Sequence, residues 1–364
     1  MLGKGDSMKR ICFVDYDMSV TGGVEQVTAS LANKLCDEYE VFVYSINDKG
    51  ELAYTLDDRI HYIKQIKGAN RLREMIKGFF KPFIEFVKKE NINTVIMMGN
   101  YPALVASFCR FFTKAQYIYC DHGAVINQWH QKTITLIRWW DAMCAHRVIT
   151  LTEKTREDYT RLLHIKADKV ECIYNWISPE VLKEREKYRE NSNKILSVGR
   201  ISSEKGFDML VEVARNVLNK HSDWEWHIYG TGELYSEIEE KIALYGLTGK
   251  LILQGNVPEV YKKFKEYSML VLTSYREGLP LVLLEANATG LPMISFDVFT
   301  GPNEVIEDGE NGFLIKPYDC KAMEDKINYL IENKEVRIRQ SENTYKYINK
   351  FSYVKIIDDW RKVL

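Results

Sequence analysis

The sequence predicts an α/β protein built from two doubly wound domains. Short apolar runs alternate with amphipathic segments from Lys9 onward, and a second series of the same kind begins after Asn193. Short apolar runs are typical of parallel strands that are covered on both faces. Regular alternation of such strands with helices favours Rossmann-like domains, which bind ligands at the carboxyl ends of their strands.

The expected elements fall into two groups. In the first half, the strands are expected at 10–16, 40–46, 93–99, 116–120 and 146–151, with a helix at 24–35. In the second half, the strands are expected at 194–199, 224–230, 250–255, 269–274 and 291–296. A polar, charged stretch separates the halves and is typical of a linker. The predicted organisation is a domain at 1–177, a linker at 178–193, a second domain at 194–345 and a C-terminal helix at 346–364.

The composition excludes several classes of protein. With 46% hydrophobic and 28% charged residues, the chain fits a folded globular protein. Its net charge of −1 gives no overall field that would favour nucleic acid, so no nucleic-acid partner is expected. The seven cysteines form no C-x-x-C pair, which disfavours a zinc site and a disulfide framework. No membrane-spanning run and no signal-peptide core is seen, so a cytoplasmic location is expected.

The stretch "YREGLPLVLLEANATGLP" (275–292) carries two glutamates in a suggestive position. Glu277 lies in a loop after an apolar strand, and Glu285 lies on the helix that begins near Pro280. Free backbone N–H groups at a helix N-terminus favour an anion such as a diphosphate. A carboxylate can accept hydrogen bonds from vicinal hydroxyls of ribose or hexose. Two polyols that flank an anion describe a nucleotide sugar, although Glu285 could instead be a solvated helix residue.

A second motif, "VGRISSEKGFDML" (198–210), supplies positive charge. Arg200 and Lys205 lie in a loop between a strand and a helix, where isolated cations usually face solvent. At the carboxyl end of a central strand, they could instead stabilise a departing nucleoside diphosphate. They would then replace a divalent metal. The Asp15-x-Asp17 pattern has no partner cluster, so no metal is expected.

The second half resembles the retaining family 4 glycosyltransferases of GT-B fold. The resemblance rests on "GRISSEKG", on the Glu-x7-Glu pair and on "TGPNEVIEDGENGFLI" (300–315), and it covers roughly 194–316. The first half is similar more weakly, through "TGGVEQV" (21–27), "CDHG" (120–123) and "IYNWI" (173–177).

The resemblance implies a role for each motif. Arg200 and Lys205 would bind the donor diphosphate, Glu277 the hydroxyls of the transferred sugar, and Glu285 the ribose. The remaining donor contacts would come from the backbone of Gly278, Leu279, Pro280 and Leu281 and, at the base, from Val257. The first domain would bind the acceptor, and the last helix would cross back onto that domain.

The first half offers two further candidates. Gly22 and Gly23 separate the first strand from the first helix and permit close approach of an anion. By the resemblance, they close over the donor diphosphate. His122 follows a strand in "DHGAV" and is expected to bond a sugar hydroxyl or to steady charge at the anomeric carbon, unless it is structural. The nucleophile is not assigned to it.

The expected function is retaining transfer of a hexose or N-acetylhexosamine from a nucleotide sugar. UDP is the commonest donor nucleotide in the family, and the acceptor would be a saccharide or lipid-linked saccharide in surface polysaccharide synthesis. Two alternatives share the fold: a nucleotide-sugar 2-epimerase and a non-catalytic donor-binding subunit. A nicotinamide oxidoreductase would need G-x-G-x-x-G, and "YGTGELY" (229–235) lacks the third glycine.

The segment 67–90 combines lysines and arginines with aromatic residues. A basic amphipathic helix of this kind can lie on an anionic membrane, here the inner face of the cell membrane. An ordinary helix with its apolar face in the core fits the same pattern, and Pro82 interrupts it. "RFFTK" (110–114) and "IRWWD" (137–141) add cations and aromatic residues that suit a lipid-linked acceptor.

Overall fold

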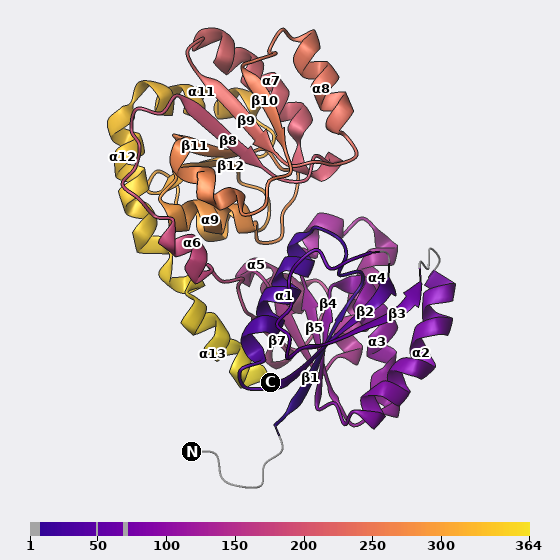
Figure 1. The fold of residues 1–364 in the computed structure, drawn as a ribbon. Helices are drawn as coiled ribbons and strands as arrows, with labels where there is room; N and C mark the ends of the chain where they lie inside the picture. Colours follow the sequence, from indigo (N-terminus) through magenta and orange to yellow (C-terminus); the bar gives the residue numbers. More distant parts are fainter. Residues whose placement is uncertain (1–7, 49, 68–71) are drawn as a thin grey trace. The chain divides into compact units, whose positions relative to one another are not determined.

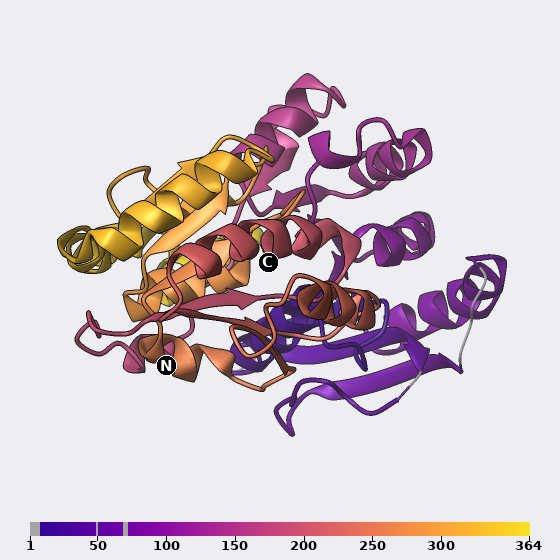
Figure 2. The same ribbon diagram turned by 90° about the horizontal axis from the view of Figure 1, so that it is seen from above.

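The computed structural model describes residues 8–48, 50–67 and 72–364 of the chain. It divides into two compact units, Met1–Ile173 with Trp360–Leu364, and Tyr174–Asp359. We call them the N-terminal and the C-terminal unit. Each consists of a parallel sheet with helices on both faces (Figures 1 and 2).

Within the described part of the N-terminal unit, seven parallel strands form a sheet of order β3-β2-β1-β4-β5-β6-β7. Their bounds are β1 (Arg10–Asp15), β2 (Glu40–Asp48), β3 (His61–Lys67), β4 (Thr94–Met98), β5 (Gln116–Asp121), β6 (Arg147–Thr150) and β7 (Val170–Cys172). Five of these match the expected strands, whereas β3 and β7 were not anticipated. Both are edge or near-edge strands, and they lack the continuous apolar run that marks a strand buried on both faces.

Helices in this unit cover both faces of the sheet. The bounds are α1 (Gly23–Leu35), α2 (Leu72–Lys89), α3 (Asn100–Ala106), α4 (Lys132–Cys144) and α5 (Glu153–Arg161), with 3-10 helices η1 (Ser107–Phe112), η2 (Ile126–Gln128) and η3 (Ala167–Lys169). On one face, α3 packs between α2 and α4. The step from β1 to β2 runs along the sheet in the direction opposite to the step from β4 to β5. Because crossover connections are right-handed, α1 therefore lies on the other face.

The apolar face of α2 lies in the core. Phe79, Phe83 and Val87 are buried, and the rings of Phe79 and Phe83 contact Tyr44 of β2 edge-on, at centroid distances of 5.6 and 5.0 Å. Of the segment 67–90, in which a membrane contact was expected, residues 68–71 lie outside the described part of the chain. The described core-facing aromatic residues of α2 therefore have no free surface to offer a membrane.

Within the described part of the C-terminal unit, six parallel strands form a sheet of order β10-β9-β8-β11-β12-β13. Their bounds are β8 (Lys194–Val198), β9 (Glu225–Tyr229), β10 (Leu251–Gly255), β11 (Met269–Leu272), β12 (Met293–Phe296) and β13 (Gly312–Ile315). All except β13 match expected strands. The four residues of β13 follow a run of charged and turn-forming residues, which hid the strand.

The helices of this unit also form two layers. The bounds are α6 (Pro179–Lys183), α7 (Phe207–Lys220), α8 (Tyr235–Leu244), α9 (Leu281–Thr289), α10 (Pro302–Val305), α11 (Cys320–Glu332), α12 (Lys334–Asn343) and α13 (Tyr353–Val363), with η4 (Ser203–Lys205), η5 (Val260–Glu266), η6 (Thr344–Tyr347) and η7 (Asn349–Phe351). α7 packs between α8 and α11, whereas α9 packs with α6 and η5.

Two segments show how the chain is divided between the units. The stretch 178–193 is bonded to the C-terminal unit, where Arg185 donates to the carbonyl of Ser341 at 3.2 Å and Tyr188 donates to that of Ser268 at 2.7 Å. The end of α13 is bonded to the N-terminal unit, where the Nε of Arg361 donates to Glu38 at 3.0 Å. Among the described helices, none has the length and apolar content needed to cross a membrane.

Each sheet has one position where the strand order reverses. In the N-terminal unit it lies between β1 and β4, and in the C-terminal unit between β8 and β11. Loops that leave neighbouring strands toward opposite faces create a crevice at the carboxyl edge, where α/β sheets bind ligands. The loops after β8 and β11 are those that carry the cationic motif and Glu277.

Gly206 allows the loop after β8 to approach β11 closely. Its φ is +63°, and a Cβ built on it would lie 2.1 Å from the carbonyl oxygen of Thr273. The hydroxyl of Thr273 donates in return to the carbonyl of Gly206 at 3.0 Å. Because only glycine combines a left-handed backbone with no Cβ, the position fixes the path of the chain next to Lys205.

We predict that Gly206→Ala destabilises the protein by about 3 kcal/mol or more, since it adds a steric clash to left-handed strain of roughly 1–2 kcal/mol. Gly246→Ala is the matched control, because Gly246 has a φ of +67° but no atom within 4 Å of its would-be Cβ. Urea unfolding would measure both free energies. Equal losses for the two variants would contradict the close approach at Gly206.

Candidate functional site

An ion pair joins the two loops at the switch point of the C-terminal unit. The ammonium of Lys205, at the end of η4, lies 2.6 Å from Oε1 of Glu277 in the loop after β11. The Glu277 side chain is only 6% exposed and that of Lys205 is 24% exposed. Removing one partner of an ion pair this far from water would leave an uncompensated buried charge, so the two side chains depend on each other.

Three further contacts hold the Glu277 loop. The hydroxyl of Ser274 donates to Oε1 of Glu277 at 2.6 Å, and that of Thr300 donates to the backbone carbonyl of Glu277 at 2.7 Å. Gly301, with a φ of +97°, lies so close that a Cβ would stand 2.4 Å from the carbonyl oxygen of Gly278. The loop before α9 is therefore clamped between the end of β11 and the "TGP" turn.

Glu285 lies on α9 in a different environment. The side chain is half-buried among buried Leu284 and Ala286. Removal from water raises the pKa of its carboxyl to about 7. Its carboxylate has no hydrogen-bond partner among the described residues, so it can accept bonds from a ligand. The solvated alternative considered for Glu285 does not agree with this burial.

The other donor residues expected from the sequence have varied exposure. Arg200 follows β8, is exposed and forms no ion pair with any described residue. Val257 lies half-buried in the loop after β10. The segment that leads into α9 contains buried and half-buried backbone positions, at Gly278, Leu279, Pro280 and Leu281. The helix itself begins at Leu281.

In the N-terminal unit, the glycine pair lies at the switch point between β1 and β4. Gly22 is the N-cap of α1, with an extended backbone, and Gly23 is the first helical residue. Nearby, Asp15 accepts a hydrogen bond from Thr28 at 2.7 Å.

The described residues contain no cluster of three or more His, Cys, Asp or Glu side chains that could hold a metal ion.

His122 follows β5 and is half-buried. Burial lowers the pKa of its imidazole to about 4, and the charge of Asp121 opposes this only in part. Nε2 of His122 is buried and has no partner among the described residues. The imidazole is therefore neutral at physiological pH and has one ring nitrogen available for a ligand.

The residue before His122 is held rigidly. The carboxylate of Asp121 accepts bonds from Nε of Arg138 at 2.9 Å, from the hydroxyl of Tyr159 at 2.7 Å and from the backbone N–H of Gly123 at 2.9 Å. Asp121 and Arg138 are almost completely buried. This network fixes the turn that carries His122.

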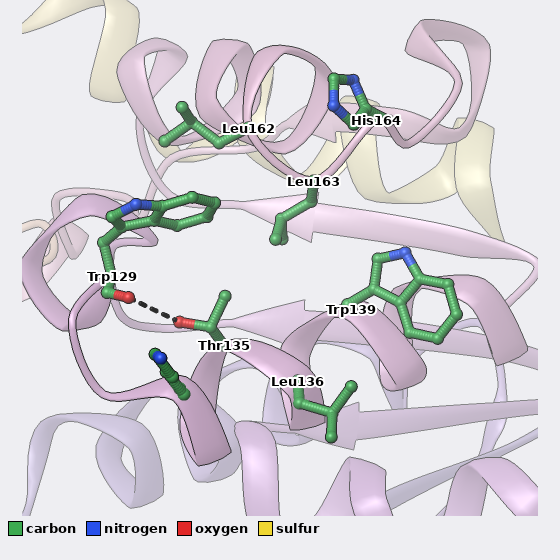
Figure 3. A pocket seen from close by; sticks show the side chains of 8 residues that line it. Trp129, Thr135, Leu136, Trp139, Leu162, Leu163 and His164 are labelled. Carbon is green, nitrogen blue, oxygen red and sulfur yellow. Dashed lines mark hydrogen bonds between the residues drawn. The ribbon is translucent and has the colours of Figure 1, made fainter.

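An apolar hollow of about 440 Å³ lies elsewhere in the N-terminal unit. Figure 3 shows the rings of Trp129 and Trp139 on two sides of it. The remaining lining residues are Lys132, Thr135, Leu136, Leu162, Leu163 and His164. None of the site residues expected from the sequence lines this hollow.

The sequence predicted the loops of the candidate site at the ends of their strands but not all of the contacts between them. The structure joins Lys205 directly to Glu277, a contact that was not anticipated. Ser274 and Thr300 were also missed as supports of Glu277. Ser274 could have been found from its place at the end of the apolar run that precedes Glu277. Thr300 could have been found from its position in the "TGPNEV" motif.

Comparisons with known proteins identify the class of this chain. A family described as "Glycosyl transferases group 1" matches residues 180–347, and "Glycosyltransferase Family 4" matches residues 21–181. An uncharacterized glycosyltransferase of Haemophilus influenzae is 27% identical over 98% of this chain and 100% of its own length. The amylovoran biosynthesis glycosyltransferase AmsD of Erwinia amylovora is 26% identical over 98% and 100%.

Solved structures show the same fold. HepE of Anabaena, crystallised with UDP and glucose, superposes with a TM-score of 0.81 at 18% identity, covering 98% of this chain and 99% of that chain. The pneumococcal O-GlcNAc transferase GtfA, crystallised with UDP and GlcNAc, gives 0.80 at 15% identity over 98% and 99%. The fold predicted from the sequence, GT-B with two Rossmann-like domains, is thereby confirmed.

Both halves thus match parts of one class of enzyme, the nucleotide-sugar-dependent glycosyltransferases of GT-B fold. The chain belongs to the glycosyl transferases group 1, glycosyltransferase family 4.

We predict that Lys205→Met destabilises the protein by about 2 kcal/mol, because it leaves the Glu277 carboxylate without its cation. Glu277→Gln in the same chain should recover at least about 1 kcal/mol of this loss. The matched control is the exposed pair of Lys220 and Glu332, whose atoms lie 2.7 Å apart. Its coupling in the same double-mutant cycle should stay below about 1 kcal/mol. Equal coupling in the two cycles would contradict the burial of the Lys205–Glu277 pair.

Proposed function

We propose that the protein transfers a hexose or N-acetylhexosamine from UDP to a saccharide or lipid-linked saccharide, with retention of anomeric configuration. The observation that carries this proposal is the Lys205–Glu277 ion pair at the switch point of the C-terminal sheet. Family membership, and the UDP and sugars bound by HepE and GtfA, support the donor class.

The donor diphosphate would lie at the loops after β8 and β11. The ammonium of Lys205 has three N–H donors, and the bond to Glu277 uses one of them. The other two can bind phosphate oxygens, together with the exposed guanidinium of Arg200 and the N–H groups that begin α9. These positive groups would stabilise the charge that develops on the departing UDP.

The two glutamates would bind the two polyols of the donor. Glu277, fixed by Lys205 and Ser274, would accept bonds from hydroxyls of the transferred sugar. Glu285 would accept bonds from the ribose, which supplies the partners that its half-buried carboxyl lacks among the described residues. Val257 and the backbone of the loop after β10 would contact the base.

Retention would follow from reaction on one face of the sugar. The departing phosphate would take the proton of the acceptor hydroxyl, and no carboxylate need attack the anomeric carbon. His122, neutral because of its burial, can accept or donate a single hydrogen bond to the sugar without adding charge. Gly22 and Gly23, at the N-terminus of α1, would contact the diphosphate.

The proposed reaction needs no metal ion. Arg200, Lys205 and the N–H groups that begin α9 would supply the positive groups that bind the diphosphate in place of a divalent ion.

Two relatives support a glycan acceptor. AmsD is described as an amylovoran biosynthesis enzyme. A Campylobacter jejuni relative, 23% identical over 98% of both chains, is described as an N-acetylgalactosaminyltransferase that acts on an undecaprenol-linked saccharide. These descriptions support a proposed reaction in surface polysaccharide or glycan synthesis, and we propose that it takes place at the inner face of the cell membrane.

Replacement of Glu277 tests the proposal. Glu277→Ala should lower the rate of sugar transfer by about a hundredfold or more, because the contacts to the sugar are lost, while UDP binding persists. Transfer would be followed with labelled UDP-sugars and a panel of saccharide acceptors, and UDP binding by calorimetry. Glu332→Ala, on the exposed surface, is the control.

Transfer by Glu277→Ala at the parental rate would contradict the proposed role. Inversion at C2 of the sugar without an acceptor, as in an epimerase, would contradict transfer itself.

The ribose contact makes donor binding depend on pH. The pKa of Glu285 is raised to about 7, so the free protein holds a proton there below that pH. Ribose hydroxyls donate to the ionised form, so binding should release a proton and weaken about tenfold between pH 8 and pH 6. Calorimetry with UDP-glucose, whose diphosphate does not titrate in this range, would measure both effects. Glu285→Gln should abolish them, and an unchanged pH dependence in that variant would exclude this role.

A further inference from the structure

An exposed aromatic surface on the N-terminal unit contains none of the residues proposed to bind the donor. It consists of residues from η1 and α4, which we call the aromatic face: Phe108, Phe111, Phe112, Leu136, Trp139 and Met143. We propose that the aromatic face binds the surface of an anionic lipid bilayer. The proposal goes beyond sugar transfer, because it concerns where the enzyme is held and does not depend on the donor.

The aromatic face gathers exposed apolar side chains from two elements that contact each other, η1 and α4. Phe111 is 60% exposed and Leu136 is 62% exposed. The ring of Phe108 lies 5.7 Å from that of Phe111 and 6.3 Å from that of Trp140, so η1 and α4 present their aromatic residues side by side. A contiguous apolar surface of this kind is rare on a protein that remains free in water. Aromatic side chains are favoured at the boundary between lipid and water.

Charge on this part of the chain is complementary to anionic lipid. Residues 91–152 contain only two acidic residues, Asp121 and Asp141, and both are buried. Lys114 and Lys132 are exposed and form no ion pair with any described residue. Arg110, on η1, donates to the carbonyl of Ala145 at 3.3 Å and adds a guanidinium to this part of the chain.

Neighbouring elements add further positive charge. Lys169, after α5, donates to the carbonyl of Met143 at 3.0 Å, at the end of α4. On α2, the negative charge of Glu85 is compensated by Lys81, whose ammonium lies 3.9 Å from its carboxylate. Cations close to an anionic bilayer strengthen binding, so Lys114, Lys132 and Lys169 add to the effect of burying aromatic side chains in lipid.

The apolar hollow beside α4 extends the aromatic face. Trp139 and Leu136 belong to both, and Trp129 closes the far side (Figure 3). Lys132 also lines the hollow. An acyl chain could therefore enter between the tryptophan rings while Lys132 meets a lipid phosphate. A purely polar partner would leave this surface in water.

This assignment differs from the one expected from the sequence. The segment 67–90 was the candidate for membrane contact, yet Phe79 and Phe83 of α2 are in the core. The exposed aromatic residues come instead from η1 and α4, within the stretches "RFFTK" and "IRWWD" and just beyond them.

Flotation of the full chain with lipid vesicles, without donor, tests the inference. The protein should bind vesicles of phosphatidylcholine with phosphatidylglycerol and bind vesicles of phosphatidylcholine alone more weakly. The double variant Phe111→Ser, Leu136→Ser should lower the bound fraction about tenfold, because it removes apolar side chains that would be buried in lipid. Lys114→Glu with Lys132→Glu should remove the preference for anionic vesicles.

Matched controls lie on the C-terminal unit. Leu244 on α8 is 80% exposed, so Leu244→Ser makes the same chemical change elsewhere, and Lys346→Glu does so for charge. Both controls should bind like the parent chain, and UDP binding by every variant would show that it is folded.

Absence of binding to anionic vesicles would overturn the inference. So would equal losses in the controls. Self-association of the parent chain that Phe111→Ser relieves, without vesicle binding, would identify the surface as a protein interface instead. Because UDP binding and transfer are measured separately, failure here is distinguishable from failure of the proposed function.

Discussion

The ion pair between Lys205 and Glu277 is the interaction on which the proposed donor site depends. It spans 72 positions of sequence, and it joins the loops after β8 and β11 where the strand order reverses. The Glu277 side chain is 6% exposed, and removing one partner of a buried ion pair leaves an uncompensated charge, so Lys205 is part of the fold as well as of the candidate site. Gly206 makes this approach possible, because any side chain there would collide with Thr273. The same pair thus serves the stability of the fold and, in the proposed function, the placing of Glu277 against the transferred sugar.

Burial favours the neutral form of two half-buried titratable groups, His122 and Glu285. Burial keeps His122 neutral, so it can bond a ligand without placing a positive charge beside the sugar. Burial also favours a proton on Glu285 near neutral pH, and a ligand with hydroxyl groups would remove that proton. Asp121 differs from both, because Arg138 and Tyr159 satisfy its carboxylate. Its network positions His122 and takes no part in the proposed chemistry.

Much of the fold could be predicted from the sequence, because central parallel strands are continuous apolar runs. The strands β3 and β7 were missed since edge strands need no such run, and β13 was hidden among charged residues. The loops of the site were located from strand ends, whereas the contact between Lys205 and Glu277 required the order of strands in the sheet. Helical periodicity also could not distinguish a face in the core from a face toward lipid. The segment that contains α2 was therefore the candidate for membrane contact, whereas the exposed aromatic residues lie on η1 and α4.

A crystal structure of the chain with UDP-glucose would test the central claim most directly. The account predicts a phosphate oxygen within about 3.2 Å of Nζ of Lys205, ribose hydroxyls at the carboxylate of Glu285, and a retained contact between Lys205 and Glu277. A nucleotide bound away from the loops after β8 and β11, with Lys205 in contact with Glu277 alone, would contradict it.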